Sequence, residues 1–460
     1  MNGWMNKRLG IAEMNPQSQS LATRFFFLRS SQTAQLQIAS TYLILFLLDI
    51  ITYTELGLLL AVQFGLTALL DYPTGALGDA IGHKNVLILA YCFYAISILF
   101  LLASNSLIGL IPFAVLTAVA ASQESGALQS WFDNNYRYAS VNFDEDRKIF
   151  GSFLGKMQAN FFLISGILFV VGGVLAATYS RRILFIVQLF LVLVALGLII
   201  LLMKNEDGME TTRPTFRAYL DRLTGGIQFV ASSRGNLFFF LGLAALAAAM
   251  ISIWGSLMLF PFYESYSGTD EYTGLLRAIL FATGVLWMLY GANLSKRIEN
   301  PHRGLFLSMF MSNFFFHVLV FGFIQVFPPP NAFILASFVG VVILFQFLGL
   351  SVSLVGVLQG RLMIELVPDK YRNAVYSLIP TLTLIFSIPL VILGGFVITH
   401  YGFSNGLLLA IALEMLGILV FGLGLYWLSK PKFGDVPPAE VPPIEDIDSA
   451  PQERPTPTSG

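Results

Sequence analysis

The sequence has little of the material from which metal centres and disulfide-bonded domains are built. Cys92 is the only cysteine, and the four histidines stand singly at residues 83, 302, 317 and 400. One thiol can form neither an internal disulfide nor a thiolate cluster, and scattered histidines do not favour a metal cage. We therefore expect no metal and no cofactor.

Charge is also scarce. Only 12% of the 460 residues are charged and 56% are hydrophobic, whereas a soluble domain carries about 25% charged residues. Residues 85–123 contain no Asp, Glu, Lys, Arg or His, and residues 305–360 contain only His317. Each block could supply two membrane crossings of about 20 residues. A water-soluble protein is excluded, and a net charge of -1 gives no attraction to nucleic acid.

Catalytic signatures are missing as well. The sequence contains no Gly-x-x-x-x-Gly-Lys-Ser/Thr loop for ATP, no Gly-x-Ser-x-Gly elbow and no His-Glu-x-x-His pair. Acids, histidines and metal ligands do not cluster at either end of the apolar runs. We predict that the protein is not an enzyme.

What the chain does have is long apolar runs, which predict twelve transmembrane helices in an all-α membrane fold, because a segment in lipid must satisfy its backbone internally. The runs lie near residues 31–49, 56–77, 86–103, 107–130, 150–178, 183–203, 236–262, 273–292, 304–327, 332–356, 374–399 and 405–428. If both termini are cytoplasmic, 22 of the 26 Lys and Arg residues fall on the cytoplasmic side, as the positive-inside rule requires. We expect a multi-pass protein of the plasma or cell inner membrane.

A polar stretch divides the runs into two sets of six. The predicted parts are a cytoplasmic segment 1–30, a six-helix bundle 31–203, a cytoplasmic loop 204–235, a second bundle 236–428 and a disordered Pro-rich tail 429–460. Residues 215–230 could form an amphipathic helix on the membrane surface. A weak repeat supports the division, because Gly126-Ala127-Leu128-Gln129-Ser130 recurs as Gly356-Val357-Leu358-Gln359-Gly360. Such duplication is typical of secondary transporters.

One motif carries a family resemblance. The end of the run at 56–77 and the turn after it read Gly75-Ala76-Leu77-Gly78-Asp79-Ala80-Ile81-Gly82-His83-Lys84, preceded by Asp71-Tyr72-Pro73-Thr74. This resembles the Gly-x-Leu-x-Asp-x-x-Gly-x-Lys/Arg loop of the major facilitator superfamily (MFS), in its multidrug-like or general branch. The twelve-helix pattern extends the resemblance over residues 31–428.

The resemblance implies two six-helix bundles that expose a central site to each side of the membrane in turn. It also implies a gating loop made of Gly75, Asp79, Gly82 and Lys84, with Asp133 as a second acid. In this reading the Asp79 carboxylate docks on the N-terminus of the helix near Arg372–Tyr376, where the helix dipole favours an anion.

Charges inside the apolar runs are the candidates for coupling, because a buried charge in a membrane is costly. Glu124 and Asp71 are candidate proton-coupling acids. The alternatives are a structural hydrogen bond between helices for Glu124 and a partner role in the gating loop for Asp71. Lys156 and Arg277 either snorkel to the membrane surface, bind an anionic substrate or pair with an acid. Four residues near the middle of helices that usually surround the central path are candidates to line the substrate cavity. They are Tyr42, Gln63, Asn160 and Trp254.

Acids and a histidine elsewhere have simpler expectations. Asp49 and Glu55 flank a short outer turn and are expected to be solvated, whereas His317 and Glu414 lie on peripheral helices and are expected to be structural. We expect a monomeric secondary active transporter that moves a small solute across the lipid bilayer by alternating access, coupled to protons, with efflux of amphipathic compounds as one form.

An uptake symporter or uniporter for a metabolite stays an alternative, as does a receptor of the same fold that moves nothing. The uptake alternative rests on two departures from drug exchangers. No basic residue lies between Lys84 and Arg137, and residues 166–173 contain glycine without proline.

Overall fold

The computed structural model describes residues 9–141, 143–144, 146–204, 216–329 and 333–429, and every regular element in this part is a helix. The side chains of residues 71–80, 216–223, 369–370 and 373 lie outside the description. The N-terminal half comprises η1 (Ile11–Glu13), α2 (Pro16–Ser40), α3 (Leu43–Leu48), α4 (Tyr53–Ile81), α5 (His83–Ala103), α6 (Leu107–Glu124), α7 (Ala127–Ala139), α8 (Lys148–Thr178) and α9 (Arg181–Leu202). The C-terminal half comprises α10 (Phe216–Ala231), α11 (Arg234–Ala249), η2 (Met250–Met258), α12 (Leu259–Ser267), α13 (Asp270–Ser295), α14 (Pro301–Phe310), η3 (Met311–Phe315), α15 (Phe316–Val326), α16 (Leu335–Leu366), α17 (Asp369–Tyr401) and α18 (Phe403–Ser429).

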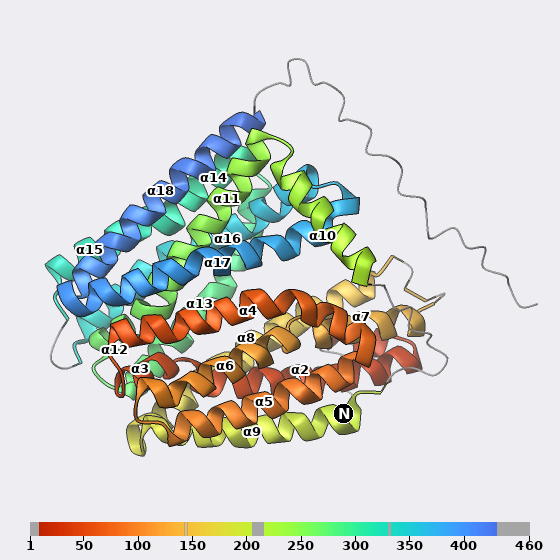
Figure 1. Cartoon of the computed structure of the whole chain (residues 1–460), viewed down its shortest axis with the longest axis horizontal. Helices are drawn as coiled ribbons and strands as arrows, with labels where there is room; N and C mark the ends of the chain where they lie inside the picture. The colour runs from red at the N-terminus through yellow and green to blue at the C-terminus, as the bar shows by residue number, and fades with distance from the viewer. Residues whose placement is uncertain (1–8, 142, 145, 205–215, 330–332, 430–460) are drawn as a thin grey trace, which may run out of the picture.

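The two halves are helical bundles that lie side by side, with the N-terminal half below and the C-terminal half above in Figure 1. Short connections alternate between the two ends of the bundle. The Arg181 end, to the left, carries the turns between α3 and α4, between α8 and α9 and between α12 and α13. The Lys84 end, to the right, carries the turn between α4 and α5 and the start of α8.

Eleven helical segments of the described chain are long and apolar enough to cross a membrane. The first of the twelve predicted transmembrane helices is not among these eleven. It is broken at residues 41–42 into α2 and α3, and α2 begins at Pro16 rather than near residue 31, so that it includes Arg24 and Arg29. It nevertheless packs along α8 and α9, and Gln32 and Gln35 are buried on it.

Breaks within helices follow local residue chemistry. The helix predicted over 107–130 is divided into α6 and α7 at Gly126, whose φ of 72° is a conformation that favours glycine. Gly356, its counterpart in the sequence repeat, lies inside the continuous helix α16. The matching strings therefore adopt different local structures. The helix predicted over residues 215–230 is confirmed as α10, which packs against α17 through Phe229 and Tyr371.

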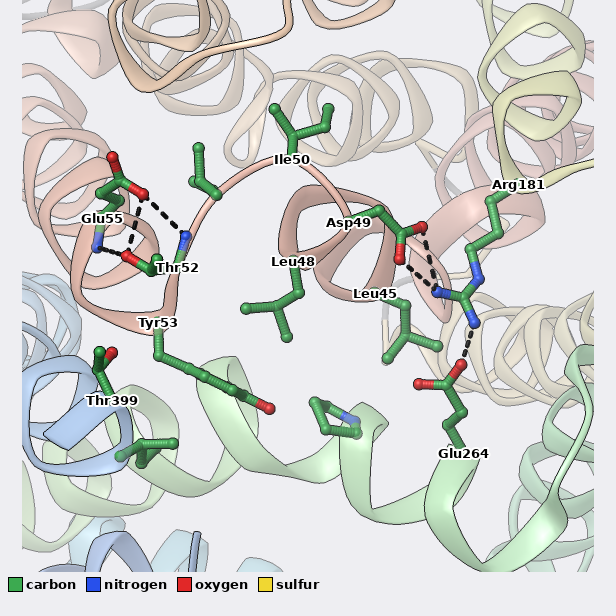
Figure 2. A pocket seen from close by; sticks show the side chains of 13 residues that line it. Leu45, Leu48, Asp49, Ile50, Thr52, Tyr53, Glu55, Arg181, Glu264 and Thr399 are labelled. Atoms are coloured by element: carbon green, nitrogen blue, oxygen red, sulfur yellow. Dashed lines mark hydrogen bonds and ion pairs between the residues drawn. The ribbon is translucent and has the colours of Figure 1, made fainter. Parts of the chain in front are cut away.

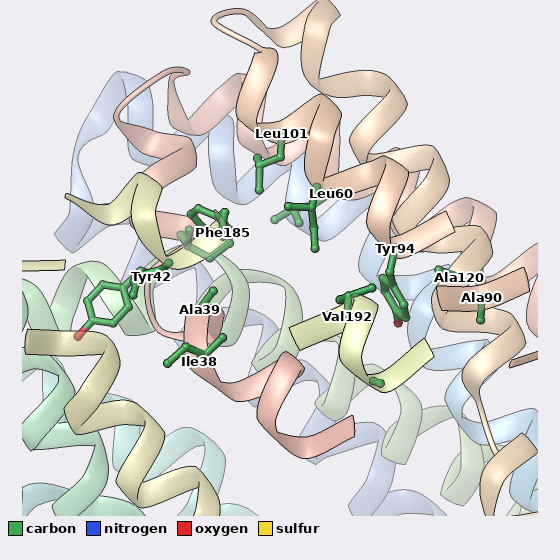
Figure 3. Packing of buried hydrophobic residues seen from close by; sticks show 14 of the residues in the cluster. Ile38, Ala39, Tyr42, Leu60, Ala90, Tyr94, Leu101, Ala120, Phe185 and Val192 are labelled. Carbon is green, nitrogen blue, oxygen red and sulfur yellow. The ribbon is translucent and has the colours of Figure 1, made fainter. Parts of the chain in front are cut away.

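The halves share buried apolar packing at the Arg181 end. One hydrophobic cluster includes Leu47 and Ile51 of the first half together with Val391 and Ile398 of the second. Figure 3 shows its N-terminal part, where side chains from α2, α4, α5, α6 and α9 converge. A second cluster contains only C-terminal residues, among them Val230 and Leu358. The interface between the halves is thus built on the shared cluster.

Two close helix crossings bring the halves together. Helix α4 crosses α17 and α8 crosses α13, and each crossing has a glycine at its tightest point. A Cβ at Gly395 would collide with the Tyr53 carbonyl, and a Cβ at Gly274 would collide with the Phe169 carbonyl. Small residues at such points let backbones approach, as is usual where helices pack in membranes.

Candidate functional site

Arg181, at the start of α9, joins the halves electrostatically. Its guanidinium contacts Asp49 of α3's C-terminus at 3.3 Å, forms a close ion pair with Glu264 of α12, and lies 2.9 Å from Asp270 at the start of α13. Figure 2 shows the Asp49 and Glu264 carboxylates turned toward it from opposite sides. One cation therefore bridges three acids from both halves. Asp49 is exposed at the outer turn, as predicted, with 57% of its side chain accessible, and its contact with Arg181 is an additional role.

A cavity of about 680 Å³ opens beside this cluster and is lined by both halves. Its walls include Tyr53 and Glu55 of α4 and Thr399 of α17. The Glu55 carboxylate bonds within its own helix end, because it completes a capping box with Thr52 at the start of α4. The cavity lies at the end of the bundle, above the packed interface, and not at its centre.

Two neutral contacts reinforce the closure of this end. The Thr54 backbone N–H donates to Thr399 Oγ1 at 2.9 Å. The Tyr42 hydroxyl donates to the backbone oxygen of Asp270 at 2.7 Å, from the break between α2 and α3. Tyr42, a candidate cavity residue, is fully buried in this contact.

Glu124 is the last residue of α6 and is buried inside the N-terminal half, with 8% of its surface exposed. Three neutral groups donate to its carboxylate: Gln32 Nε2 at 2.7 Å, the Tyr91 hydroxyl at 3.0 Å and the Tyr94 hydroxyl at 2.9 Å. Gln32 in turn accepts from Arg29 Nη1 at 2.6 Å. No Lys, Arg or His in the described chain forms an ion pair with Glu124.

Arg277 on α13 lies between the halves. Its Nη1 donates to Ser40 Oγ at 2.8 Å and to Thr41 Oγ1 at 2.7 Å, both at the end of α2. The guanidinium also lies 4.0 Å from the ring centre of Phe169 on α8 and 4.8 Å from that of Phe260 on α12. Arg277 therefore points into the interface rather than toward the membrane surface.

The residues predicted to form the gating loop lie at the Lys84 end. Lys84 donates to the Ile200 backbone oxygen at 2.7 Å, near the C-terminus of α9, where the helix dipole favours a cation. Gly82 joins α4 to α5 with a φ of 87°. Asp133 pairs with Arg137 at 3.0 Å and forms a close ion pair with Arg147 within its own half. The side chains of Asp71 and Asp79, and residue Gly75, lie outside the part whose side chains are described.

The remaining cavity candidates are distributed over both bundles. Gln63 on α4 is half-buried and forms no hydrogen bond with a described residue. Asn160 on α8 donates to Ser30 Oγ at 3.1 Å, which joins it to α2. Trp254 lies in the π-helix η2 with 1% of its surface exposed, packed against Phe262 and His317. Solute contact by these residues stays a prediction.

Two buried groups that sequence reasoning treated separately form a pair. His317 Nδ1 lies 2.8 Å from Glu414 Oε2, and both side chains are fully buried in the C-terminal half. His317 Nδ1 also lies 2.9 Å from the Asn313 backbone oxygen. Glu264, the third acid of the Arg181 cluster, was not singled out from the sequence. It stands at the end of an apolar run, and only the spatial neighbourhood of Arg181 marks it.

Comparison with known protein families shows to which family the chain belongs. The sequence profile of the Major Facilitator Superfamily matches residues 25–379. The chain belongs to the major facilitator superfamily. It is therefore a multi-pass membrane protein and a secondary transporter of a small solute, in a family that is not enzymatic.

Solved MFS structures share the fold across almost the whole chain. A point mutant of the nucleoside transporter NupG has a TM-score of 0.68 at 14% identity, and the alignment covers 89% of this chain and 100% of that one. A bacterial homolog of the human lysosomal transporter Spinster, in an inward-facing and unoccupied conformation, has a TM-score of 0.64 at 12% identity, covering 90% and 98% of the two chains. A search of curated protein sequences gave no match.

Proposed function

We propose that this MFS transporter is coupled to protons and that Glu124 is the residue that binds and releases the coupling proton. The observation that carries the proposal is the environment of Glu124, a buried carboxylate held only by neutral donors. A carboxylate with a permanent ion-pair partner would have no reason to bind a proton. Glu124 has no such partner in the described part of the chain.

The surroundings of Glu124 connect three helices of the N-terminal half. Glu124 ends α6 and is buried, and its three hydrogen-bond donors come from α2 and α5. A small displacement of either helix would therefore change the contacts of the carboxylate.

The proposed cycle moves the two halves about a central site. The contacts around Arg181 support a conformation closed at that end, and we infer from the Lys and Arg distribution that the Lys84 end is cytoplasmic. In the opposite conformation, Asp79 would dock on the N-terminal end of α17 and hold the Lys84 end closed. Asp71 is the second acid that we would place in coupling.

The test uses Glu124→Gln, which resembles the protonated acid and cannot titrate. A thermal-stability screen against a solute panel first identifies a solute, because a ligand at 100 times its dissociation constant stabilises the folded state by about 2.7 kcal/mol. In proteoliposomes, Glu124→Gln should exchange that solute but fail to accumulate it when a pH gradient is imposed. The direction of accumulation in the native protein separates uptake from efflux.

Glu414→Gln is the matched control, because Glu414 is equally buried but lies in the other bundle beside His317. It should retain gradient-driven accumulation. Accumulation that survives in Glu124→Gln would assign Glu124 a structural role and make Asp71 the next acid to test.

A further inference from the structure

Arg277 is a cation deep in the interface between the halves, and its compensation is unusual. In the described chain no Asp or Glu forms an ion pair with it. Its polar partners are two hydroxyl groups, those of Ser40 and Thr41. A charge at this depth in a membrane protein is expensive unless a partner or a function compensates it.

A comparison with Arg181 shows that the acids of this region pair with one arginine and not with the other. Arg181 contacts three carboxylates, those of Asp49, Glu264 and Asp270. Arg277 lies seven residues from Asp270 on the same helix, which corresponds to about 10 Å along the axis. These three acids are thus held by Arg181, and in the described chain Arg277 forms no ion pair with an Asp or Glu.

The free part of the guanidinium has the geometry of an anion receptor. Nη1 is used by Ser40 and Thr41, whereas Nε and Nη2 donate to no described group. Neither nitrogen is among the fully buried atoms that lack a partner, and Arg277 as a whole is only partly buried, so these two donors are not sealed by the protein. Nε and Nη2 together form the fork that binds both oxygens of a carboxylate.

Aromatic rings from both halves surround this fork. Phe169 and Phe260 lie against the guanidinium, and Phe281, one turn further along α13, has its ring centre 5.6 Å from it. Phe281 also packs edge-on against Phe169 at 4.8 Å and near Phe162 at 5.8 Å. These rings offer apolar and π surface beside the cation, which suits a flat apolar body attached to an anionic group.

We propose that Arg277 is the substrate-recognition residue of the central site and that the transported solute is a small organic anion, a carboxylate carried on a flat apolar or aromatic body. The inference rests on the proposed transport function and names its substrate class. The two oxygens bind Nε and Nη2, and the body packs on Phe169 and Phe281. Because the site uses groups of both halves, occupancy stabilises the conformation in which they meet.

Arg277 could instead serve only to offset the excess of acids around Arg181. That role predicts no preference among neutral and anionic probes of the same shape. The proposed role predicts a strong preference for the anion. The two readings therefore separate in a binding measurement that needs no proton gradient and no knowledge of the natural substrate.

The experiment measures thermal unfolding of the purified full-length protein in detergent during titration with benzoate, acetate, cyclohexanecarboxylate and the neutral isostere benzamide, each to about 10 mM. Benzoate should stabilise the protein saturably and more strongly than acetate, and benzamide should not. Arg277→Gln should weaken benzoate binding about tenfold or more, as loss of a charge-assisted contact does. Arg277→Lys, which keeps the charge but lacks the fork, should give an intermediate loss.

Arg182→Gln is the matched control, because Arg182 bonds the Leu102 backbone oxygen away from this site and should leave benzoate binding unchanged. Glu124→Gln should also bind benzoate, so failure of proton coupling would leave the present inference intact. Equal stabilisation by benzamide and benzoate, no stabilisation by any of the carboxylates, or native-like binding in Arg277→Gln and Arg277→Lys would each overturn it.

Discussion

Arg181 and Asp270 form a two-point contact between the halves of the transporter. Arg181 Nη2 donates to Asp270 Oδ1 at 2.9 Å, and Nε reaches the two carboxylate oxygens at 3.2 and 3.1 Å. The side chains are only 16% and 14% exposed, so solvent screens the pair weakly. Any motion that separates the halves at this end must break it.

Arg181→Gln should therefore favour the conformation that is open at the Arg181 end. A charge-assisted hydrogen bond of this kind contributes about 1.5 to 3 kcal/mol, which corresponds to a population shift of about tenfold or more. Spin labels at Tyr179 and Tyr401, both exposed at this end, in a Cys92→Ser background should report a longer distance between the halves. Arg182→Gln should leave the distance distribution as in the parent, and an unchanged distribution in Arg181→Gln would refute the role of the cluster.

Gly274→Ala should oppose closure by steric means rather than by charge. The added Cβ would meet the Phe169 carbonyl and the Tyr42 hydroxyl, and overpacking of this kind costs about 1 to 3 kcal/mol. The same spin-label pair should show the open distance more often. Gly166→Ala on α8 is the matched control, since its Cβ would face open space. Identical distance distributions in the two variants would show that the crossing of α8 and α13 accommodates the added methyl group without opening.

Asp144 should make stability depend on pH at the Lys84 end. Burial alone would raise the pKa of its carboxyl, but hydrogen bonds from the Phe150 and Ile149 backbone N–H groups and from the Tyr136 hydroxyl outweigh burial and lower it. The carboxylate thereby caps α8, whose preceding residue Arg147 has a φ of 55°. Because the folded pKa is below the unfolded value of about 3.9, this stabilisation is complete above that value and is lost as pH falls through the folded pKa.

Asp144→Asn should accordingly lower the free energy of unfolding by about 1 kcal/mol at neutral pH, as loss of a helix cap does. Thermal unfolding of the native and variant proteins should converge as the pH is lowered below about 4. Asp146→Asn, at an exposed position in the same loop, should show no such convergence. A constant difference between Asp144→Asn and the native protein across the pH range would contradict this account.

The orientation in the membrane is testable with single cysteines in the Cys92→Ser background. Arg137→Cys lies at the Lys84 end and Glu271→Cys at the Arg181 end, and both positions are exposed. We expect an impermeant thiol reagent added to whole cells to label Glu271→Cys and to reach Arg137→Cys only after permeabilisation. The reverse pattern would invert the proposed topology.

Apolar runs predicted most of the fold because a membrane helix must be continuous and apolar wherever it faces lipid. The first helix was predicted to begin near residue 31, and it begins at Pro16. The polar side chains that concealed its start include Arg24 and Arg29, which donate to the Lys204 backbone oxygen and to Gln32 Oε1 within the N-terminal half. Hydropathy cannot register a helix whose polar residues are satisfied by neighbours rather than by water.

The chemistry of the candidate site was less accessible from sequence. Glu124 was identifiable as a charge within an apolar run, but its donors stand 30 to 92 residues away along the chain. His317 and Glu414, 97 residues apart, gave no sign of pairing. From the sequence Arg277 was open to snorkelling, to anion binding or to pairing with an acid, and its contacts with Ser40 and Thr41 follow only from the packing of one half against the other.

The polarity of α2 also bears on how the chain enters the membrane during synthesis. A charged residue near the middle of an inserting helix costs about 2.5 to 3.5 kcal/mol, and α2 carries Arg24 and Arg29 together with buried glutamine. Such a segment gains little free energy when it moves by itself from the translocon into the lipid. We expect α2 to remain at the translocon until α4 and the later helices of its bundle emerge, so that a nascent chain ending after α3 would be extractable from the membrane whereas one ending after α9 would not.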